Sequence, residues 1–291
     1  KKEVKQQPKT IQIFLPDGNP RSVKIAEITS RTVQATLIPR SKIDEAAKRK
    51  ELFGVGVYYL FGENEEGAKP LIYVGESEEC LARLRQHNRD KDFWQLAIVI
   101  TSKTQYFTKS HVKFLEAYSA EIVNNAKRYH LENSTKPVKP HISESAEADL
   151  QDNFDTIRLL VSTLGYPVFE EMSKARTDET LECRGKKAVA KAEYTEDGMV
   201  VLSGSLANVE LTSSAGPWVT GMRERLLNDG VLIREGEVFK FVTDHVFNSP
   251  SAAAAVVLAR SANGWTEWKY PDGKTLDEVK RKSDQKELED E

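Results

Sequence analysis

One apolar run constrains the fold of this chain more than any other segment. Residues 94–100 read Trp-Gln-Leu-Ala-Ile-Val-Ile, so apolar side chains fill both alternating sets of positions. Successive side chains of a strand point to opposite faces, and a strand that is apolar on both faces is typical of a sheet interior. We therefore expect a strand over residues 93–101 at the centre of a small α/β sandwich.

The segments around this run supply the other layers. Two further apolar runs, residues 55–61 and 71–74, are expected as adjacent strands joined by a polar segment. Helices are expected over residues 78–88 and 108–129, and the second carries an apolar stripe at helical spacing, formed by Val112, Leu115, Ile122, Val123 and Ala126. The order strand, strand, helix, strand, helix indicates an α/β fold with a small mixed sheet.

Residues 10–50 are interpreted as an N-terminal β extension. Alternating apolar residues on both sides of the turn at residues 16–20 predict a β-hairpin. A third strand is expected at residues 33–37, and Ser41 is expected to cap a short helix after it. Because this extension is too small to fold alone, we expect it to pair with or pack on the sheet that follows.

A proline-containing break and a charged segment divide the rest of the chain. Residues 134–140 contain two prolines, and Ser143 or Ser145 is expected to cap the helix that follows over residues 146–164. After a charged linker we expect, in chain order, a hairpin of residues 200–202 and 209–211, a helix over 218–227, a hairpin over 231–242 that turns at Glu235-Gly236, a helix over 252–260 that Pro250 opens, and a strand over 265–269.

A chain of 291 residues exceeds what one compact core usually spans, so two domains are expected. Both ends are charged and polar, and we expect no chemistry from either. The predicted division is, in order, disordered residues 1–9, the β extension 10–50, the α/β domain with a trailing helix 51–169, a linker 170–190, a separate α+β domain 191–280, and a disordered tail 281–291.

Composition excludes some classes of protein. Hydrophobic residues make up 39% of the chain and charged residues 30%, a globular balance without an apolar run near the roughly 18 residues that a membrane span needs. We expect no membrane partner and no targeting leader, and hence a cytoplasmic location. Cys80 and Cys183 match no metal-ligand spacing, so free thiols are expected.

The overall charge argues against attraction of the whole surface to nucleic acid, because the net charge is −3 and the sequence pI is about 6.1. Any DNA binding must therefore be local. One basic cluster surrounds the first predicted helix and the start of the second, and it consists of Arg83, Arg85, Arg89, Lys91, Lys103, Lys109 and Lys113. An ordinary solvated face is the alternative explanation for this cluster.

Two glycine–tyrosine triplets occupy the adjacent strands. Gly56-Val57-Tyr58 lies on the first strand and Tyr73-Val74-Gly75 on the second, where each glycine allows a backbone or a substrate to approach closely. Arg83 follows Tyr73 by ten residues on the next helix, and His87 lies four residues further on the same helical face. Packing tyrosines and a surface arginine with a surface histidine are the structural alternatives.

Glu116 and Asn133 complete the set of polar candidates. Glu116 lies at the edge of the apolar stripe of the second helix, where a half-buried carboxylate is costly unless it is paired or bound to a cation. A salt bridge to a nearby lysine is its structural alternative. Asn133 precedes the proline-containing segment, and it could equally end a helix.

The order of these residues resembles the GIY-YIG nuclease family, over residues 54–133 and with Val in place of Ile in both triplets. The resemblance implies a metal-dependent DNA endonuclease that uses Mg²⁺ or Mn²⁺. It implies that Tyr58 takes the proton of the attacking water and that Tyr73 orients this water. In the same way it implies that Arg83 stabilises transition-state charge, that His87 contacts the phosphate or relays a proton, that Glu116 binds the metal, and that Asn133 lies near the scissile phosphate or the metal.

Further residues of this domain are expected to contact the DNA substrate. These are Gly75, Arg85, Arg89, Lys109 and Lys113. Repair, restriction and phage defence are the expected settings of such a nuclease. Two alternatives remain open at this point, a non-catalytic DNA-binding or adaptor protein and a nuclease that cleaves RNA.

The C-terminal part resembles a domain of unknown function found behind such nucleases and in restriction-related proteins. The residues that carry this resemblance are Phe247-Asn248-Ser249-Pro250-Ser251-Ala252-Ala253-Ala254-Ala255 and Ser261-Ala262-Asn263-Gly264-Trp265-Thr266-Glu267-Trp268. We interpret the domain as a DNA-targeting module in which one tryptophan is exposed, and its possible DNA contacts are Trp265, Trp268, Arg260 and Lys269. Burial of both tryptophans and a winged-helix fold are the alternatives.

Overall fold

The computed structural model of the chain describes residues 8–65, 67–171 and 180–281. It divides into two compact units, an N-terminal domain of residues 1–64 and 69–171 and a C-terminal domain that includes residues 65–68 and is otherwise described from residue 180 onward. The protein is a mixed α/β protein with two separate sheets, as expected. Most of the terminal segments 1–9 and 281–291, and most of the first half of the linker 170–190, lie outside the described residues.

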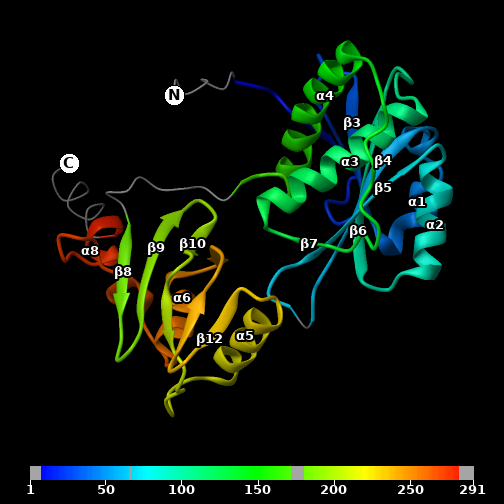
Figure 1. Cartoon of the computed structure of the whole chain (residues 1–291). Coiled ribbons are helices and arrows are strands. Elements are labelled where there is room, and N and C mark those ends of the chain that lie inside the picture. Colours follow the sequence, from blue (N-terminus) through cyan, green and yellow to red (C-terminus); the bar gives the residue numbers. More distant parts are fainter. Residues whose placement is uncertain (1–7, 66, 172–179, 282–291) are drawn as a thin grey trace. The chain divides into compact units, whose positions relative to one another are not determined.

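The N-terminal domain is built on a seven-stranded sheet of order β1-β2-β3-β6-β4-β5-β7, in which only the β5–β7 pair is parallel (Figure 1). The expectation of a central strand is confirmed, because β6 pairs with β3 on one side and β4 on the other. The strands are β1 Gln12–Phe14, β2 Lys24–Glu27, β3 Val33–Pro39, β4 Gly56–Gly62, β5 Leu71–Ser77, β6 Trp94–Ser102 and β7 His130–Leu131.

The β extension forms three of the seven strands of this sheet rather than a separate layer, since β3 pairs with β6 along its whole length. The predicted pairing with the following sheet is thus confirmed. The prediction that Ser41 caps a helix is wrong, because Ser41 lies inside the short helix η1 Arg40–Lys42, which begins directly after the strand at Pro39. Two further short helices follow, α1 Ile43–Ala46 and η2 Lys50–Leu52.

Helices cover both faces of the N-terminal sheet (Figure 1). On one face lie α3 Lys109–Ala126 and α4 Glu144–Thr163, and on the other lie α1 and α2 Cys80–Asp90. Successive side chains of β4 point to opposite faces of the sheet and contribute to two separate hydrophobic cores. Tyr59 packs under α3, whereas Tyr58 packs under α2. The Tyr59 hydroxyl hydrogen-bonds the Ser119 hydroxyl of α3 at 2.9 Å, which fixes α3 on the sheet.

Helix boundaries agree with the predictions to within a few residues. Ser143, rather than Ser145, caps α4 by accepting a hydrogen bond from the Ala146 amide. Helix α3 ends at Ala126, three residues before the predicted end, because Lys127 adopts a left-handed conformation with φ of 56°. Cys80 and Cys183 are free and buried, as expected. No helix in the described ranges has the length and apolar character of a membrane span.

The C-terminal domain contains a second seven-stranded sheet, with the order β12-β13-β11-β9-β10-β14 and β8 paired with β9. Strand β8 lies inside the predicted linker 170–190, so this part of that prediction is wrong. Its buried residues Leu181 and Cys183 alternate with charged ones, and the charged residues give this strand the composition of a linker. The strands are β8 Leu181–Arg184, β9 Val189–Thr195, β10 Gly198–Val201, β11 Leu206–Asn208, β12 Leu232–Glu235, β13 Val238–Phe241 and β14 His245–Phe247.

One of the two predicted hairpins of this domain is confirmed and the other is wrong. The hairpin over residues 231–242 is confirmed as β12 and β13. The pairing of residues 200–202 with 209–211 is wrong, because β10 pairs with β9 and β11 pairs with β13 and β9. Buried alanines on β9 carry little apolar signal in the sequence, so this central strand was missed. A winged helix does not describe the domain, since the β12–β13 hairpin is the edge of the larger sheet.

Helices α5 Pro217–Asn228 and α6 Pro250–Leu258 confirm their predictions, and Ser249 caps α6. The strand predicted over residues 265–269 is wrong. Residues Gly264–Glu267 form the short helix α7, because the Asn263 side chain accepts a hydrogen bond from the Trp265 amide, and Gly264 packs directly on the backbone of Pro250. Helix α8 Leu276–Lys280 follows.

Candidate active site

The hydroxyl group of Tyr58 lies directly over Gly75. These residues face one another across the β4–β5 pair, and a Cβ atom placed on Gly75 would be only 2.3 Å from the Tyr58 oxygen. No larger residue fits at position 75 without moving the phenol, so Gly75 allows the close approach that the sequence suggested. Gly56, at the start of β4, likewise allows a close approach, because a Cβ atom placed on it would be 2.9 Å from the Cys80 sulfur of α2.

Three aromatic rings gather on the α2 face of the sheet. The Tyr58 and Tyr73 ring centroids are 6.3 Å apart, and the His87 ring lies 5.6 Å from the first and 5.1 Å from the second. The Tyr58 hydroxyl and His87 Nε2 are 2.8 Å apart and share a hydrogen bond. The structure therefore brings both predicted tyrosines and the predicted histidine into one cluster.

His87 is buried, with only 3% of its surface exposed. Burial, followed by the positive charges of Arg83 and Lys91, lowers the pKa of His87 to about 4, so the imidazole is neutral at pH 7. Of the two roles predicted for His87, burial favours a proton relay through Tyr58 over direct contact with a phosphate.

Arg83 extends from α2 to the two tyrosines. Its Nη1 donates to the Gln86 side chain at 2.5 Å, and the nearby hydroxyls of Tyr58 and Tyr73 raise the pKa of Arg83. Burial raises the pKa of Tyr58 well above its ordinary value, the neighbouring Tyr73 raises it further, and the nearby Arg83 guanidinium opposes the rise. In the free protein Tyr58 is thus a neutral phenol with a cation and a neutral imidazole beside its oxygen.

Glu116 lies on α3, which covers the opposite face of the sheet from α2. Burial, followed by the charge of Glu76, raises the pKa of Glu116 to about 7. The charges of Lys109, Lys113 and Arg83 oppose this rise, so Arg83 acts electrostatically on Glu116 as well as on the tyrosines. The predicted salt-bridge alternative is not observed for Glu116, since the described residues contain no ion pair to its carboxylate.

The donor set near Glu116 suits a hard divalent cation. Glu76 belongs to the α3 face of β5, and its negative charge raises the pKa of Glu116, so a cation bound near both carboxylates would relieve this repulsion. Mg²⁺ is commonly held by one or two carboxylates, with waters and substrate oxygens as the other ligands. No group of three or more potential metal-ligating side chains occurs in the described ranges.

Asn133 is used as a backbone clamp. Its Oδ1 accepts a hydrogen bond from the Val74 amide at 3.0 Å, and its Nδ2 donates one to the Val74 carbonyl at 2.7 Å. Strand β7 pairs only with Leu71 and Ile72, so the Asn133 side chain prolongs this pairing by one step. Asn133 follows a strand rather than a helix, and it positions the residues on either side of Val74, which are Tyr73 and Gly75.

The predicted substrate contacts fall into different environments. Lys109 pairs with Glu76 at 2.8 Å, whereas Lys113 is exposed and acts on Glu116 only electrostatically. Arg85 is paired with Asp44 of α1 at 3.6 Å and does not join the tyrosine cluster. Arg89 is exposed in the last turn of α2.

Two residues of this site were not among the predicted site residues, although Lys91 belongs to the predicted basic cluster. Glu76 directly follows the second triplet, and strand alternation places it on the face opposite Gly75, towards Glu116. The Lys91 amine lies 4.7 Å from the centre of the Tyr73 ring, a cation–π contact. Alternation could have identified Glu76 from the sequence, but no pattern pointed to Lys91 in particular.

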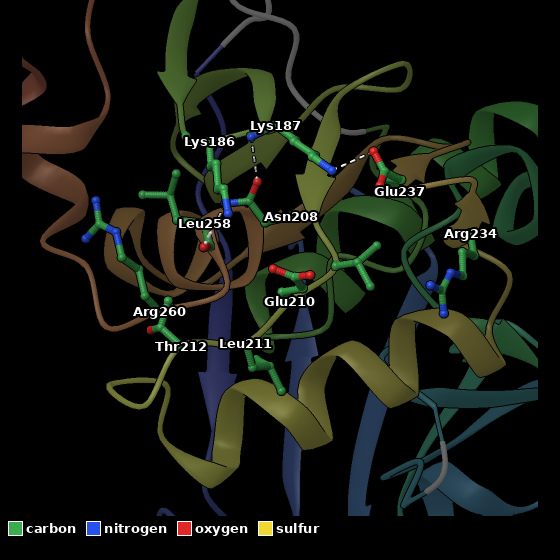
Figure 2. Close-up of a pocket in the computed structure, with 12 residues that line it drawn as sticks. Lys186, Lys187, Asn208, Glu210, Leu211, Thr212, Arg234, Glu237, Leu258 and Arg260 are labelled. Atoms are coloured by element: carbon green, nitrogen blue, oxygen red, sulfur yellow. Dashed lines mark hydrogen bonds and ion pairs between the residues drawn. The ribbon is translucent and has the colours of Figure 1, made fainter.

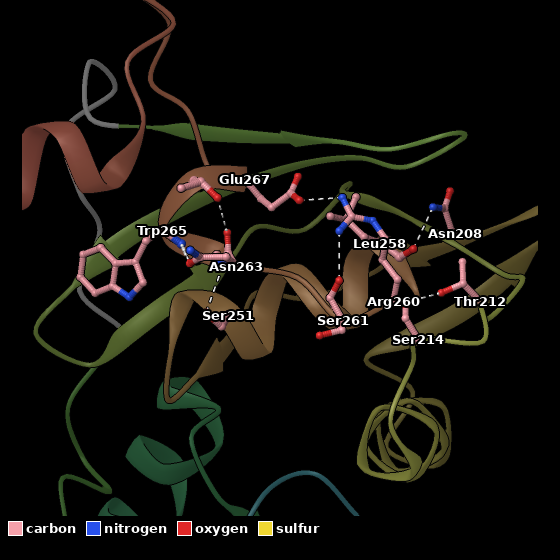
Figure 3. A network of polar contacts seen from close by, with 12 residues as sticks. Asn208, Thr212, Ser214, Ser251, Leu258, Arg260, Ser261, Asn263, Trp265 and Glu267 are labelled. Atoms are coloured by element: carbon pink, nitrogen blue, oxygen red, sulfur yellow. Dashed lines mark hydrogen bonds and ion pairs between the residues drawn. The ribbon is translucent and has the colours of Figure 1, made fainter.

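In the C-terminal domain, Arg260 lines a pocket between the β8–β9 turn, β12 and the end of α6 (Figure 2). Its guanidinium is engaged, since it donates to Glu267 at 2.6 Å and to the Ser261 carbonyl at 3.0 Å (Figure 3). Lys269 is exposed, and its backbone bridges to Glu182.

The two tryptophans differ, as predicted, although they lie on a helix and its end rather than on a strand. Trp268 is fully buried and donates to the Pro250 carbonyl at 3.0 Å, so the proposal that it contacts DNA is wrong. Trp265 is partly exposed, with the Arg281 guanidinium 3.5 Å from its ring centre and Tyr194 against its edge. Figure 3 shows Trp265 turned away from the network that holds Arg260.

Comparison with known proteins identifies the C-terminal domain only. Residues 181–280 match a family described as a domain of unknown function, DUF4357. No curated protein and no solved structure matches the chain. The C-terminal resemblance is thus supported, whereas the resemblance of residues 54–133 to GIY-YIG nucleases has no family match and stays a prediction.

Proposed function

We propose that this protein is a GIY-YIG-type endonuclease that hydrolyses DNA phosphodiester bonds with the help of one divalent metal ion, Mg²⁺ or Mn²⁺. One observation carries the proposal most strongly: the Tyr58 oxygen lies over Gly75 with His87 at 2.8 Å and the Arg83 guanidinium beside it. A phenol that only filled space in the core would need neither a missing side chain beneath it nor two polar partners.

Proton transfer begins at the hydroxyl of Tyr58 in this proposal. Because its pKa is raised, Tyr58 cannot act as a free phenolate at neutral pH. It can accept the proton of an attacking water only if its own proton moves on, and the neutral His87 within hydrogen-bond distance is the acceptor. Tyr73 orients the water from the adjacent strand.

Charge is balanced by two groups on different helices. The Arg83 guanidinium offers several donors to the phosphate oxygens, on which negative charge increases during attack. Glu116, with Glu76 beside it, would hold the metal, and a bound Mg²⁺ or Mn²⁺ would supply Lewis-acid stabilisation of the departing oxygen. Lys109 and Lys113 keep positive charge near the two carboxylates.

A cleavage assay with matched variants tests this proposal. Plasmid DNA, single-stranded DNA and RNA are incubated with Mg²⁺ or Mn²⁺, with a chelator in parallel. We expect cleavage of DNA that the chelator abolishes, and losses of about 10²- to 10⁴-fold in Tyr58→Phe and Arg83→Ala. Glu116→Gln is expected to lose metal dependence together with activity.

Each of these variants has a control of the same chemical change. Tyr59→Phe removes a phenol hydroxyl from the same strand but on the opposite face. Arg31→Ala removes a guanidinium of the same domain that is paired with Asp152, and Glu121→Gln removes a carboxylate from α3 that is paired with Lys139. Equal losses in variants and controls would count against the assigned roles.

The same experiment tests the two alternative functions, a non-catalytic DNA-binding protein and an RNA nuclease. A non-catalytic DNA-binding protein would retain DNA without cutting it at any metal concentration. An RNA nuclease would cut the RNA substrate in preference to both DNA forms. The C-terminal domain is proposed to hold DNA for the catalytic domain.

A further inference from the structure

The C-terminal domain contains a pocket with a cavity volume of about 420 Å³, within the range of small-ligand sites. Four segments that are distant in the sequence form it. They are the β8–β9 turn with Lys186 and Lys187, the segment after β11 with Glu210, strand β12 with Arg234, and the end of α6 with Leu258 and Arg260 (Figure 2).

Two of the four cations of this pocket are neutralised by acidic partners. Lys187 pairs with Glu237 at 2.5 Å, and Arg260 pairs with Glu267 at 2.6 Å. Lys186 and Arg234 have no acidic partner in the described parts of the chain, although the Arg234 Nε donates to the Gly236 carbonyl at 3.3 Å. The free positive charge of the pocket therefore belongs to these two residues.

Glu210 is the unpaired acceptor of the pocket. Figure 2 shows its carboxylate between Lys186 on one side and Arg234 on the other. No hydrogen bond or ion pair joins this carboxylate to any residue that the structure describes. A ligand that fits must carry an anionic group for the cations and also a hydrogen-bond donor for Glu210.

The wall behind these groups is held rigidly. The Asn208 side chain accepts from the Lys187 amide at 2.9 Å and donates to the Leu258 carbonyl at 3.1 Å, which ties the β8–β9 turn to α6. The buried Arg223 donates to the Asn208 carbonyl from behind. Leu211 and Leu258 add apolar surface to this wall. Because the wall is fixed before a ligand arrives, little ordering is needed on binding.

From these contacts we infer that the pocket binds a nucleotide with an amino-bearing base. Lys186 and Arg234 hold the phosphate, Glu210 accepts a hydrogen bond from the exocyclic amino group of cytosine, adenine or guanine, and Leu211 and Leu258 contact the apolar part. The volume suits one nucleotide, which is either free or a single unit of a DNA strand. This inference deepens the DNA-holding role proposed for the C-terminal domain and does not require the catalytic residues.

Calorimetric titration of the full chain in a chelator tests the inference without interference from cleavage. Deoxycytidine, deoxyadenosine and thymidine monophosphates are compared with inorganic phosphate. We expect saturable binding of the first two, and binding of thymidine monophosphate weaker by about fivefold or more, because thymine lacks the exocyclic amino group. A single-stranded oligonucleotide of cytosine, compared with the mononucleotide, shows whether the ligand is free or part of a strand.

Three exposed residues supply the variants. Lys186→Gln is expected to weaken binding of deoxycytidine monophosphate by about tenfold, the value of one charge-assisted hydrogen bond. Glu210→Ala is expected to remove the preference over thymidine monophosphate. Lys191→Gln changes the charge of the same domain outside the pocket and is expected to leave binding unchanged.

Three results would overturn the inference. They are no saturable binding of either amino-bearing nucleotide, equal binding of thymidine monophosphate, and equal weakening by Lys186→Gln and Lys191→Gln. Inactivity in the cleavage assay would not affect these titrations, so the failure of one proposal is distinguished from the failure of the other.

Discussion

In the N-terminal domain His87 and Glu116 of the candidate site are buried or half-buried, whereas the ionisable groups of the C-terminal pocket lie at the surface. Burial lowers the pKa of His87 to about 4 and raises the pKa of Glu116 to about 7. In the pocket, Lys186, Arg234 and Glu210 are exposed. Groups that must change protonation benefit from shifted pKa values, and groups that only hold a ligand do not.

Both sites are supported by an asparagine side chain that is hydrogen-bonded to the main chain. An asparagine side chain makes two hydrogen bonds to main-chain groups in each domain, Asn133 to Val74 and Asn208 to Lys187 and Leu258. In the first domain this clamp aligns a strand beside buried phenols, and in the second it joins a turn to a helix. The contrast therefore lies in burial and charge rather than in rigidity.

The largest expected effect is a loss of cleavage rate in Tyr58→Phe, which separates catalysis by the N-terminal domain from nucleotide binding by the C-terminal domain. Tyr58→Phe should reduce the cleavage rate by about 10²- to 10⁴-fold and leave nucleotide binding by the C-terminal domain unchanged. Lys186→Gln should weaken nucleotide binding and leave the cleavage rate unchanged. Rates with a short oligonucleotide and titrations with a mononucleotide measure the two separately, and a loss of both activities in Tyr58→Phe would remove the contrast.

The next largest expected effect is a loss of stability when Gly75 is replaced by alanine. Gly75→Ala forces a Cβ atom to 2.3 Å from the Tyr58 oxygen, and such overpacking costs about 1–3 kcal/mol in the free energy of unfolding. Because the phenol must move, cleavage should fall as well. Chemical denaturation and the cleavage assay measure the two losses.

Gly221→Ala is the matched control in the C-terminal domain. Gly221 lies within α5, and nothing lies within 4 Å of the position of its added Cβ. We expect this variant to be more stable by about 0.5–1 kcal/mol, since alanine favours the helix. Destabilisation of both variants by the same amount would contradict the close contact inferred at Gly75.

The pH dependence of cleavage is expected to report Glu116. A carboxyl group must lose its proton to bind a metal, so the rate at limiting Mg²⁺ should rise about tenfold per pH unit below pH 7 and level off above it. Lys113→Gln removes a charge that lowers the pKa of Glu116, so it should move this rise to higher pH. A rate that does not change between pH 5.5 and about 8 would refute the assignment.

The last expected effect is on stability at acidic pH. The folded-state pKa of His87 is depressed, so its contribution to stability is present above its unfolded value of 6.5 and is lost as the pH falls towards about 4. The melting temperature of the wild type should therefore fall more steeply over this window than that of His87→Gln. If the melting temperatures of the two proteins fell equally with pH, His87 would not be neutral and buried.

Much of the N-terminal fold followed from the sequence, because long apolar runs report burial directly. The run at residues 94–100 predicted the central strand, and the stripe of α3 predicted a helix on the sheet. Alanine-rich β9 has weak signals of this kind, and its charged neighbours suggested a linker. The turn at Trp265 became helical through the Asn263 cap and the contact of Gly264 with Pro250, which no local pattern showed.

The sequence by itself determined which chemical groups are available: two phenols, a guanidinium, an imidazole and a carboxylate, in an order that resembles a nuclease family. Only the tertiary structure decided that His87 is buried against Tyr58, that Glu76 joins Glu116, and that Lys186 and Glu210 share a pocket. The physical reason is that burial and charge at a side chain depend on residues distant in the chain, and these set the pKa and the partners of each group.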